Sequence, residues 1–237
     1  MLTQFKTKEF IFQGRDAKIL YPSCPANGKL LLKTEYFSAF PYLEVAMLKK
    51  GYTLCFMSHP NRWAPDSETH ITAEFVKFVA AELGFEAKCI PVGMSCGGLQ
   101  ALRLAQLYPE LVSVMYIDAP VTNILSLAGL GERADPSERV WEELVEAYGF
   151  TDRSSVVNFR RSPIDFMDIL IQHDIPIIML YGDADTIVLY RENGKVLEDY
   201  YRDHGGRMKI ICKPGCEHHP HSLEDPTPIV EFIEANL

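Results

Sequence analysis

The segment at residues 93–97, of sequence GMSCG, constrains the fold of this chain more than any other feature. The apolar run 87–92 precedes it, and the helical run 99–108 follows it. A G-x-S-x-G sequence between a strand and a helix is typical of a sharp turn that lifts its serine out of the sheet. The helix that starts beneath the serine favours negative charge near the turn. The segment therefore predicts a strand, a tight turn with Ser95 exposed on it, and a helix.

Two more strand-like runs lie downstream, and each leads into a polar loop. Residues 175–181 (IPIIMLY) lead into GDAD, which contains Asp183 and Asp185. Residues 208–212 lead into PGCEH, which ends at His218. An acid followed by a histidine is the order expected downstream of a serine on such a turn.

These three motifs in this order resemble the α/β-hydrolase superfamily, over about residues 29–237. The resemblance implies that Ser95 is a nucleophile, Asp185 its orienting acid and His218 its base. In such a set the histidine takes the serine proton, and the acid holds the imidazole in the right tautomer. Asp185 stands three residues after Gly182 and His218 four residues after Pro214, which are the offsets of the family. Alternatives stay open for the acid (Asp183, Asp118) and for the base (His219, His221).

The resemblance also implies an oxyanion hole built from two backbone N–H groups. The first is expected from Cys96, directly after the serine. The second is expected from the loop after the short strand 30–32, where many members have His-Gly and this chain has KTEYF at 33–37. Tyr36 is the predicted donor, with Glu35 and Phe37 as alternatives. The Cys96 side chain is expected to point away from Ser95 into packing.

The rest of the chain alternates strands with helices, which predicts an α/β fold with a mainly parallel sheet and helices on both faces. A hairpin is expected over 9–13 and 18–21, strands over 52–57 and 111–117, and helices over 41–50 and 71–83. Residues 121–174 lack a clear strand and contain an amphipathic run at 140–148. They are predicted to form a small helical cap on a single α/β-hydrolase domain, 1–237.

Composition excludes several kinds of partner. The chain has 237 residues and a net charge of −9, with no basic stretch to neutralise phosphates, so neither nucleic acid nor an anionic membrane is an expected partner. No apolar run approaches the roughly 20 residues that span a bilayer. The start, 1–12, does not resemble a signal peptide, and a cytoplasmic location is expected. The six cysteines are expected to be reduced, with Cys55, Cys89 and Cys212 inside buried strands.

No cofactor is expected, because a serine, a base and two N–H donors complete the chemistry. An alternative interpretation of the loop 216–221 is a zinc site, formed by Cys216 and the histidines at 218, 219 and 221. Their spacing fits none of the common structural zinc patterns, so no metal is predicted.

Three residues that follow strand ends are predicted to contact substrate: Glu35, Phe37 and Trp63. Aromatic and polar groups together suit a sugar ring or a polar acyl ester, although ordinary loop residues would have the same composition. The segments TEYF (34–37) and CEHHPHS (216–222) resemble a group of bacterial hydrolases thought to remove acyl groups from carbohydrates.

The sequence therefore predicts a serine hydrolase that cleaves carboxylic esters of small molecules, with carbohydrate esters as one substrate class. A peptidase, an amidase or an acyltransferase with the same three residues is an alternative. A non-catalytic binding protein on this fold is a third reading, which has no need of all three residues.

Overall fold

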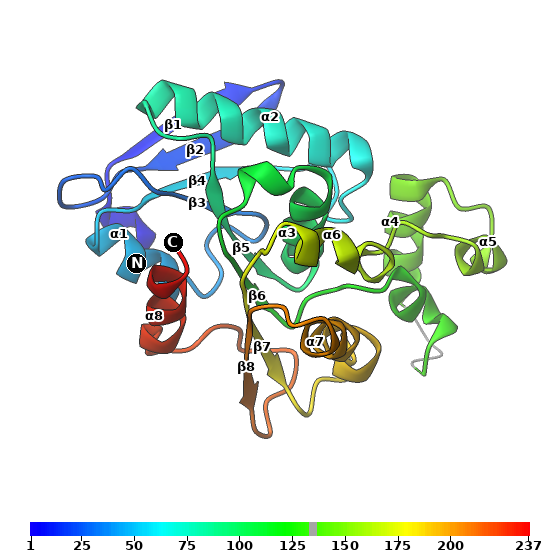
Figure 1. Cartoon of the computed structure of the whole chain (residues 1–237). Helices are drawn as coiled ribbons and strands as arrows, with labels where there is room; N and C mark the ends of the chain where they lie inside the picture. Colours follow the sequence, from blue (N-terminus) through cyan, green and yellow to red (C-terminus); the bar gives the residue numbers. More distant parts are fainter. Residues whose placement is uncertain (133–136) are drawn as a thin grey trace.

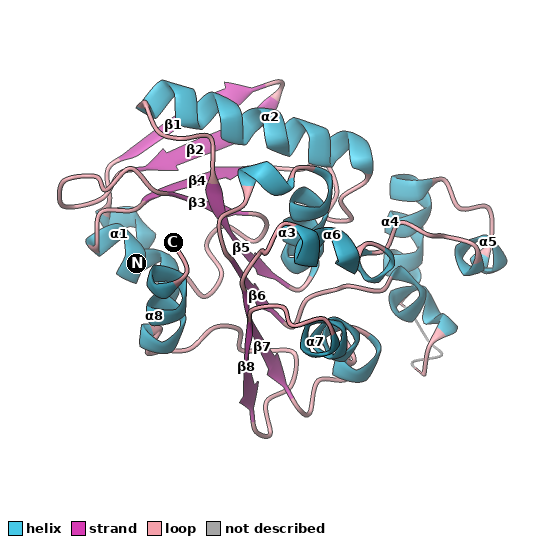
Figure 2. Cartoon of the chain, in the orientation of Figure 1, coloured by secondary structure: helices cyan, strands magenta, loops and turns pink. Residues whose placement is uncertain are grey.

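The computed structural model describes residues 1–132 and 137–237, which form an eight-stranded sheet flanked by helices (Figures 1 and 2). The strand order is β1-β2-β4-β3-β5-β6-β7-β8. β1 pairs antiparallel with β2, and β2 pairs antiparallel with β4, whereas the pairs from β4 through β8 are parallel. The strands are β1 (Thr7–Phe12), β2 (Arg15–Leu20), β3 (Leu30–Lys33), β4 (Thr53–Met57), β5 (Cys89–Met94), β6 (Met115–Asp118), β7 (Ile177–Gly182) and β8 (Met208–Lys213).

Helices cover both faces of this sheet (Figure 2). One face packs against Phe75 of α2, Leu104 of α3, Leu170 of α6 and Leu197 of α7. The opposite face packs against α1 and α8. The α-helices are α1 (Tyr42–Lys49), α2 (Asp66–Leu83), α3 (Cys96–Leu107), α4 (Glu138–Tyr148), α5 (Arg153–Val157), α6 (Met167–Gln172), α7 (Gly194–Asp203) and α8 (Thr227–Ala235). Short 3₁₀ turns lie at Leu2–Gln4, Pro109–Leu111, Pro163–Asp165 and Tyr190–Glu192, and a π-helical turn at Ser126–Leu130.

The central strands are buried on both sides. Every residue of β3 and of β5 is buried, as expected for interior strands of a parallel sheet, and the one charged residue among them, Lys33, pairs with the buried carboxylate of Glu44. Successive side chains point to opposite faces, so Leu30 and Leu32 join one core and Leu31 joins the other. This pattern confirms the prediction of an α/β fold with helices on both faces.

Element boundaries differ from the sequence prediction in two places near the serine. β5 reaches Met94, and α3 begins at Cys96, so a single residue separates strand from helix. The strand predicted over 111–117 is shorter, because Pro109–Leu111 forms a 3₁₀ turn and β6 starts only at Met115.

The prediction that Cys212 is buried was wrong. β8 is the last strand of the sheet and Cys212 is exposed, whereas Cys55 and Cys89 on interior strands are buried. Periodicity identified the strand, but only the strand order reveals which strand lies at an edge. All six cysteines, each among the described residues, are free thiols.

Residues 133–136 are outside the described residues; in the described remainder of the segment 121–174 the regular elements are helices, and α4 and α5 lie beyond α3 and α6 at the right of the view (Figure 1). α4 begins after Ser137, whose hydroxyl accepts a hydrogen bond from the Val140 N–H, and it ends at Tyr148, with Gly149 in a left-handed conformation as its C-terminal cap. Leu144 of α4 packs in one cluster with Trp63 and Leu99. Within the described ranges, no helix has the length and apolar character needed to cross a membrane.

Candidate active site

Ser95 occupies a strained turn between β5 and α3. Its φ is +53° and its ψ is −119°, a conformation that a residue with a Cβ rarely adopts. Three backbone hydrogen bonds hold it there: the Ser95 N–H donates to the Asp118 carbonyl at 2.9 Å, and the Ser95 carbonyl accepts from Gly98 and Val121 at 3.0 Å each. Strain of this kind persists only where the surroundings enforce it, and it is concentrated at functional sites.

The glycines around Ser95 are required by close backbone contacts. A Cβ on Gly93 would lie 2.3 Å from the Gly97 carbonyl oxygen. A Cβ on Gly98 would lie 2.5 Å from Pro120 Cβ, so α3 packs against the chain just after β6 at this point. Side chains at either position would push α3 away from the sheet.

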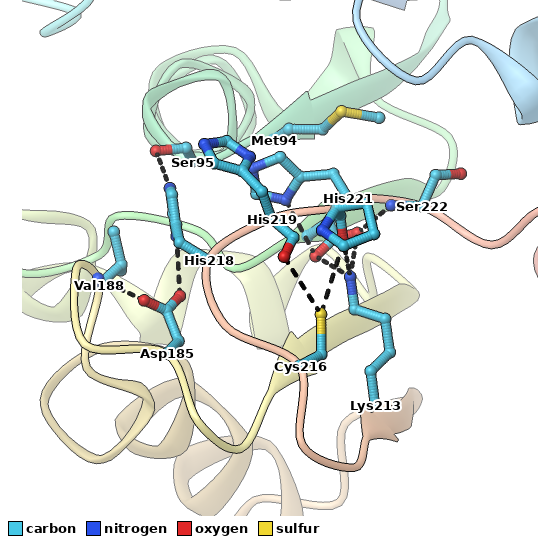
Figure 3. Close-up of polar contacts among 12 residues, drawn as sticks. Met94, Ser95, Asp185, Val188, Lys213, Cys216, His218, His219, His221 and Ser222 are labelled. Atoms are coloured by element: carbon cyan, nitrogen blue, oxygen red, sulfur yellow. Dashed lines mark hydrogen bonds and ion pairs between the residues drawn. The ribbon is translucent and has the colours of Figure 1, made fainter.

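Ser95, His218 and Asp185 are joined by hydrogen bonds (Figure 3). His218 Nε2 lies 3.0 Å from Ser95 Oγ, and His218 Nδ1 lies 2.7 Å from Asp185 Oδ2. Asp185 Oδ1 accepts from the N–H groups of Ile187 at 2.8 Å and Val188 at 2.9 Å. Burial alone would raise the pKa of Asp185, but the bonds from His218 and these two N–H groups hold it below its ordinary value.

The loops that carry the acid and the histidine are fastened to each other. The Ala184 N–H donates to the Cys216 carbonyl at 3.0 Å, and Asp183 Oδ1 accepts from the Gly215 N–H at 2.6 Å. A Cβ on Gly182 would lie 2.1 Å from that Cys216 carbonyl oxygen, so Gly182 allows this approach. In the sequence Gly182 marks only the spacing to Asp185, and no local pattern reveals this contact.

The alternative acids and bases have other partners. Asp183 joins the two loops, as a turn residue does. Asp118 is fully buried and accepts from the Ser222 N–H at 2.5 Å and from Lys213 Nζ at 3.3 Å. Burial alone would raise the pKa of Asp118, but contacts with His221, Lys213 and Ser222 hold it below its ordinary value. His219 and His221 flank His218, and neither is the histidine bonded to Ser95.

The predicted oxyanion donors lie at the same end of the sheet. Cys96 is the first residue of α3, so its N–H has no acceptor within the helix. Tyr36 has a φ of +53°, and its N–H donates to the carboxylate of Glu35 at 3.3 Å. Thr34 Oγ1 donates to the Gly97 carbonyl at 2.7 Å, which holds this loop against the start of α3. For the Tyr36 N–H to serve an oxyanion, the Glu35 carboxylate must move aside.

A cavity of about 470 Å³ opens beside Ser95. Its walls come from the loop after β3, the loop after β4, the segment 121–174, and the loops of Asp185 and His218. Most of the wall is apolar. The lining residues are Tyr36, Ala39, Phe40, Arg62, Trp63, Met94, Ser95, Cys96, Val121, Leu127, Val140, Ile187, Val188, His218, His219 and His221.

Of the three predicted substrate-contacting residues, the structure brings only Trp63 into the cavity wall. Trp63 Nε1 donates to Glu143 Oε2 at 2.9 Å. The Glu35 carboxylate instead accepts from Gln100 Nε2 at 2.8 Å. Phe37 packs against Phe56, with ring centroids 5.1 Å apart, and faces a separate hollow near Leu2. The loop turns at Tyr36, which carries Phe37 away from Ser95.

Arg62 also lines the cavity, and its Nε lies 2.8 Å from Glu143 Oε2 of α4. Glu143 is 81 residues from Arg62 in the sequence, so no local sequence pattern could have identified this pairing. Burial alone would raise the pKa of Glu143, but bonds from Trp63, Arg139 and Arg62 hold it below its ordinary value. The loop after β4 is thereby joined to α4.

The Cys96 side chain is buried and also forms part of the cavity wall. Burial raises the pKa of its thiol to about 11, although Arg62 acts in the opposite direction. A thiol with that pKa is protonated near neutral pH and is a weak nucleophile. The expectation that the Cys96 side chain points away from Ser95 into packing is met only in part, because the side chain packs with Trp63 and Leu99 but also lines the cavity beside Ser95.

No protein-family profile and no curated protein sequence matches the chain. Solved structures do match it over 98% of its length. One is an acylaminoacyl peptidase from Pyrococcus horikoshii, with a TM-score of 0.74 and 13% sequence identity, of which the match covers 42%. Another is an acylaminoacyl peptidase in complex with Z-Gly-Gly-Phe-chloromethyl ketone, with a TM-score of 0.73 and 15% sequence identity, of which the match also covers 42%. A candidate dipeptidyl aminopeptidase IV from Bacteroides ovatus also matches, with a TM-score of 0.66 and 15% sequence identity, over 36% of that chain.

The chain therefore has the α/β-hydrolase fold, which the resemblance implied. At these identities the likeness concerns the fold. The chain spans less than half of the length of each of these three proteins.

Proposed function

We propose that this protein is a serine hydrolase that cleaves an acyl bond of a small substrate through an acyl-enzyme. The observation that carries the proposal is the hydrogen-bonded series from Ser95 Oγ through His218 to Asp185, at the wall of an apolar cavity. These contacts support the roles of nucleophile, base and orienting acid that we propose for the three groups.

In the first half of the reaction, Ser95 Oγ attacks the carbonyl carbon of the substrate. His218 Nε2 takes the hydroxyl proton as the new C–O bond forms. The carbonyl oxygen becomes an oxyanion, which the N–H of Cys96 stabilises, joined by the N–H of Tyr36 once the Glu35 carboxylate has moved aside. His218 then gives its proton to the leaving alcohol or amine, and the acyl group stays on Ser95.

In the second half, a water molecule replaces the leaving group. His218 takes a proton from the water molecule as the water oxygen attacks the acyl carbon. Collapse of the intermediate breaks the bond to Ser95 Oγ, returns the proton to that oxygen and releases the acid. Asp185 accepts the hydrogen bond of His218 Nδ1 throughout and stabilises the imidazolium form. No step calls for a metal ion or an organic cofactor.

The cavity favours an apolar acyl group. Leu127, Val140 and Val188 line it, and the polar groups are gathered at Ser95, Arg62 and the histidines. Carboxylic esters of small molecules, including acylated sugars, are the first substrate class that we propose. The segment 121–174 would then act as a cap that closes the acyl site through Leu127 and Val140.

Short acylated peptides are the second class. The matching structures include two acylaminoacyl peptidases, whose names describe cleavage of acylated amino acids from peptides. The same three groups can cleave an amide when His218 protonates the leaving amine.

A matched set of substrates separates the two classes. Purified protein is assayed with the same acyl group on p-nitrophenol, on a sugar hydroxyl and on an aminoacyl p-nitroanilide. An esterase would show the largest kcat/KM with the first two compounds, and a peptidase a substantial rate with the third. Absence of turnover with all three, together with no reaction of Ser95 with a fluorophosphonate, would contradict the proposed function.

A further inference from the structure

Three histidines on the loop after β8 face one another. The ring centroids of His218 and His219, and of His218 and His221, lie 4.9 Å apart, and those of His219 and His221 lie 4.8 Å apart (Figure 3). One ring nitrogen from each lies within 4.8 Å of the others. The proposed reaction uses only His218, so the other two rings have no role in it.

The two buried histidines are each backed by a carboxylate. His218 Nδ1 lies 2.7 Å from Asp185 Oδ2, and His221 Nδ1 lies 3.3 Å from Asp118 Oδ1. At His218 the hydrogen bond to Asp185 favours the tautomer with its proton on Nδ1, which leaves a lone pair on Nε2, and at His221 the nearby negative charge of Asp118 favours the same tautomer. Histidines that bind metal ions usually have such a carboxylate or carbonyl at the other nitrogen.

His221 carries an additional sign of a missing partner. Its side chain is 3% exposed and lines the cavity, and neither ring nitrogen makes a hydrogen bond within the described part of the chain, since the 3.3 Å approach of Nδ1 to Asp118 is a charged contact only. A buried ring nitrogen without a partner costs free energy, which a ligand at that nitrogen would recover.

We propose that His218, His219 and His221 form a binding site for a zinc-like divalent ion, and that the bound ion inhibits the enzyme reversibly. The inhibitory part rests on the proposed function of Ser95 and His218. Neutral imidazole nitrogens are preferred ligands of Zn²⁺ and of its neighbours Co²⁺, Ni²⁺ and Cu²⁺, whereas Mg²⁺ and Ca²⁺ prefer oxygen.

Small side-chain movements would complete the site. With Zn–N distances of about 2.0–2.1 Å, two ligand nitrogens in a tetrahedral site lie about 3.3 Å apart. The three nitrogens must therefore come closer than their present separation of up to 4.8 Å. His219 is exposed, so its ring can turn toward the buried pair without opening the core. The carboxylates of Asp118 and Asp185 supply two negative charges behind the ligands, against one positive charge from Lys213.

Inhibition is expected because catalysis and metal binding both need the lone pair on His218 Nε2. His218 Nε2 takes the proton of Ser95 in the proposed reaction, and the same nitrogen would bind the ion. While the metal–nitrogen bond exists, Ser95 has no base. No covalent bond of the protein changes, so a chelator restores the free histidine.

Calorimetric titration of the full chain, freed of metals by chelation, tests binding without any reference to activity. We expect one Zn²⁺ per chain, and an affinity at least about 10-fold lower in His219→Ala, since even the loss of an outer partner costs about 10- to 100-fold. His204→Ala is the matched control, because His204 is also exposed but bonds the Tyr200 carbonyl on α7. His219→Gln repeats the test if His219→Ala does not fold.

Cys216→Ser separates this site from a thiolate site. The Cys216 sulfur lies 3.8 Å from the His219 carbonyl oxygen, close enough for a rearranged loop to offer it as a ligand. We expect Cys216→Ser to keep the parent affinity, and the Co²⁺-loaded protein to lack a thiolate charge-transfer band. Loss of binding in Cys216→Ser, equal binding in His219→Ala, or no stoichiometric binding to the parent would each overturn the proposal.

The inhibitory part is tested through the rate at which a fluorophosphonate labels Ser95. Zn²⁺ should slow labelling of the parent and of His204→Ala, and should have little effect on His219→Ala at the same concentration. Mg²⁺ and Ca²⁺ should have none. Stoichiometric binding that leaves labelling unchanged would contradict the shared use of His218. A parent that never reacts at Ser95 would refute the proposed function instead, and calorimetry would still decide whether the metal site exists.

Discussion

His218 Nδ1 lies 2.7 Å from Asp185 Oδ2, although the two residues are 33 positions apart and belong to different loops. The backbone accounts for this proximity. The bond from the Gly215 N–H to Asp183 and the bond from Ala184 to Cys216 fasten the loops together just before each functional residue. Asp183 therefore contributes to the position of the pair, and Asp185 contributes its charge.

This division of roles predicts different effects for two similar substitutions. Asp185→Asn should lower kcat by about 10⁴-fold, because an amide favours the wrong tautomer of His218. Asp183→Asn keeps an oxygen that can accept from Gly215, so its effect on kcat should be less than about 10-fold and should be accompanied by a small loss of stability. Steady-state kinetics and urea unfolding of both variants measure this. The opposite ranking would show that Asp183 is the orienting acid.

The cap role of residues 121–174 can be tested at the cavity wall. Val140 of α4 lines the cavity. Val140→Trp should fill part of it and lower kcat/KM for long acyl chains relative to acetyl by at least about 10-fold, since one methylene in such a site is worth about 1–3 kcal/mol. Val157 on α5 is 48% exposed, and Val157→Ala serves as the control. If Val140→Trp kept the chain-length preference of the parent, the segment would not shape specificity.

His59 should make the protein less stable in mild acid. Burial, aided by the charge of Arg15, lowers its pKa from 6.5 to about 4, and its Nε2 is bonded to Thr72 Oγ1 at 2.9 Å. As pH falls below 6.5, the unfolded chain binds a proton that the folded chain does not. Stability contributed by neutral His59 is therefore present near pH 7 and is lost between about pH 6.5 and 4.

Between pH 7 and pH 5 this effect amounts to up to about 2 kcal/mol of the free energy of unfolding. His59→Gln can keep a hydrogen bond to Thr72 and removes the titration. Urea unfolding of parent and variant at both pH values isolates the effect as a difference. Equal pH dependence in the two proteins would show that His59 is already solvated in the folded state.

Catalysis should not require a metal ion. The proposed reaction assigns its base to His218 and its oxyanion donors to Cys96 and Tyr36, so no step needs a Lewis acid. After exhaustive dialysis against EDTA, kcat/KM should therefore be at least as high as that of the undialysed protein. Activity lost on dialysis and restored by Zn²⁺ would mean that the histidine cluster holds a catalytic ion, contrary to both proposals.

The positions of Ser95, Asp185 and His218 could be predicted because each follows its own strand at a short, fixed offset. Parallel strands bring those loops to one edge of the sheet. The direction of individual side chains in longer loops could not be predicted. Phe37 follows Tyr36, whose positive φ turns the chain and places Phe37 on Phe56.

Contacts between segments that are distant in the sequence could not be predicted either. The Tyr148 hydroxyl donates to the Trp63 carbonyl. The pairing of Arg62 with Glu143 closes the same side of the cavity. Both contacts depend on how residues 121–174 fold back over the sheet, which neither propensity nor periodicity determines.

The reactivity of Ser95 tests the central claim most directly. Purified parent and Ser95→Ala protein are treated with a fluorophosphonate, analysed by mass spectrometry, and assayed on the ester and amide substrates. We predict one adduct per chain at Ser95, none in Ser95→Ala, and a fall in kcat/KM of at least about 10³-fold with an unchanged circular dichroism spectrum. An adduct on another residue, or a Ser95→Ala protein as active as the parent, would contradict the account.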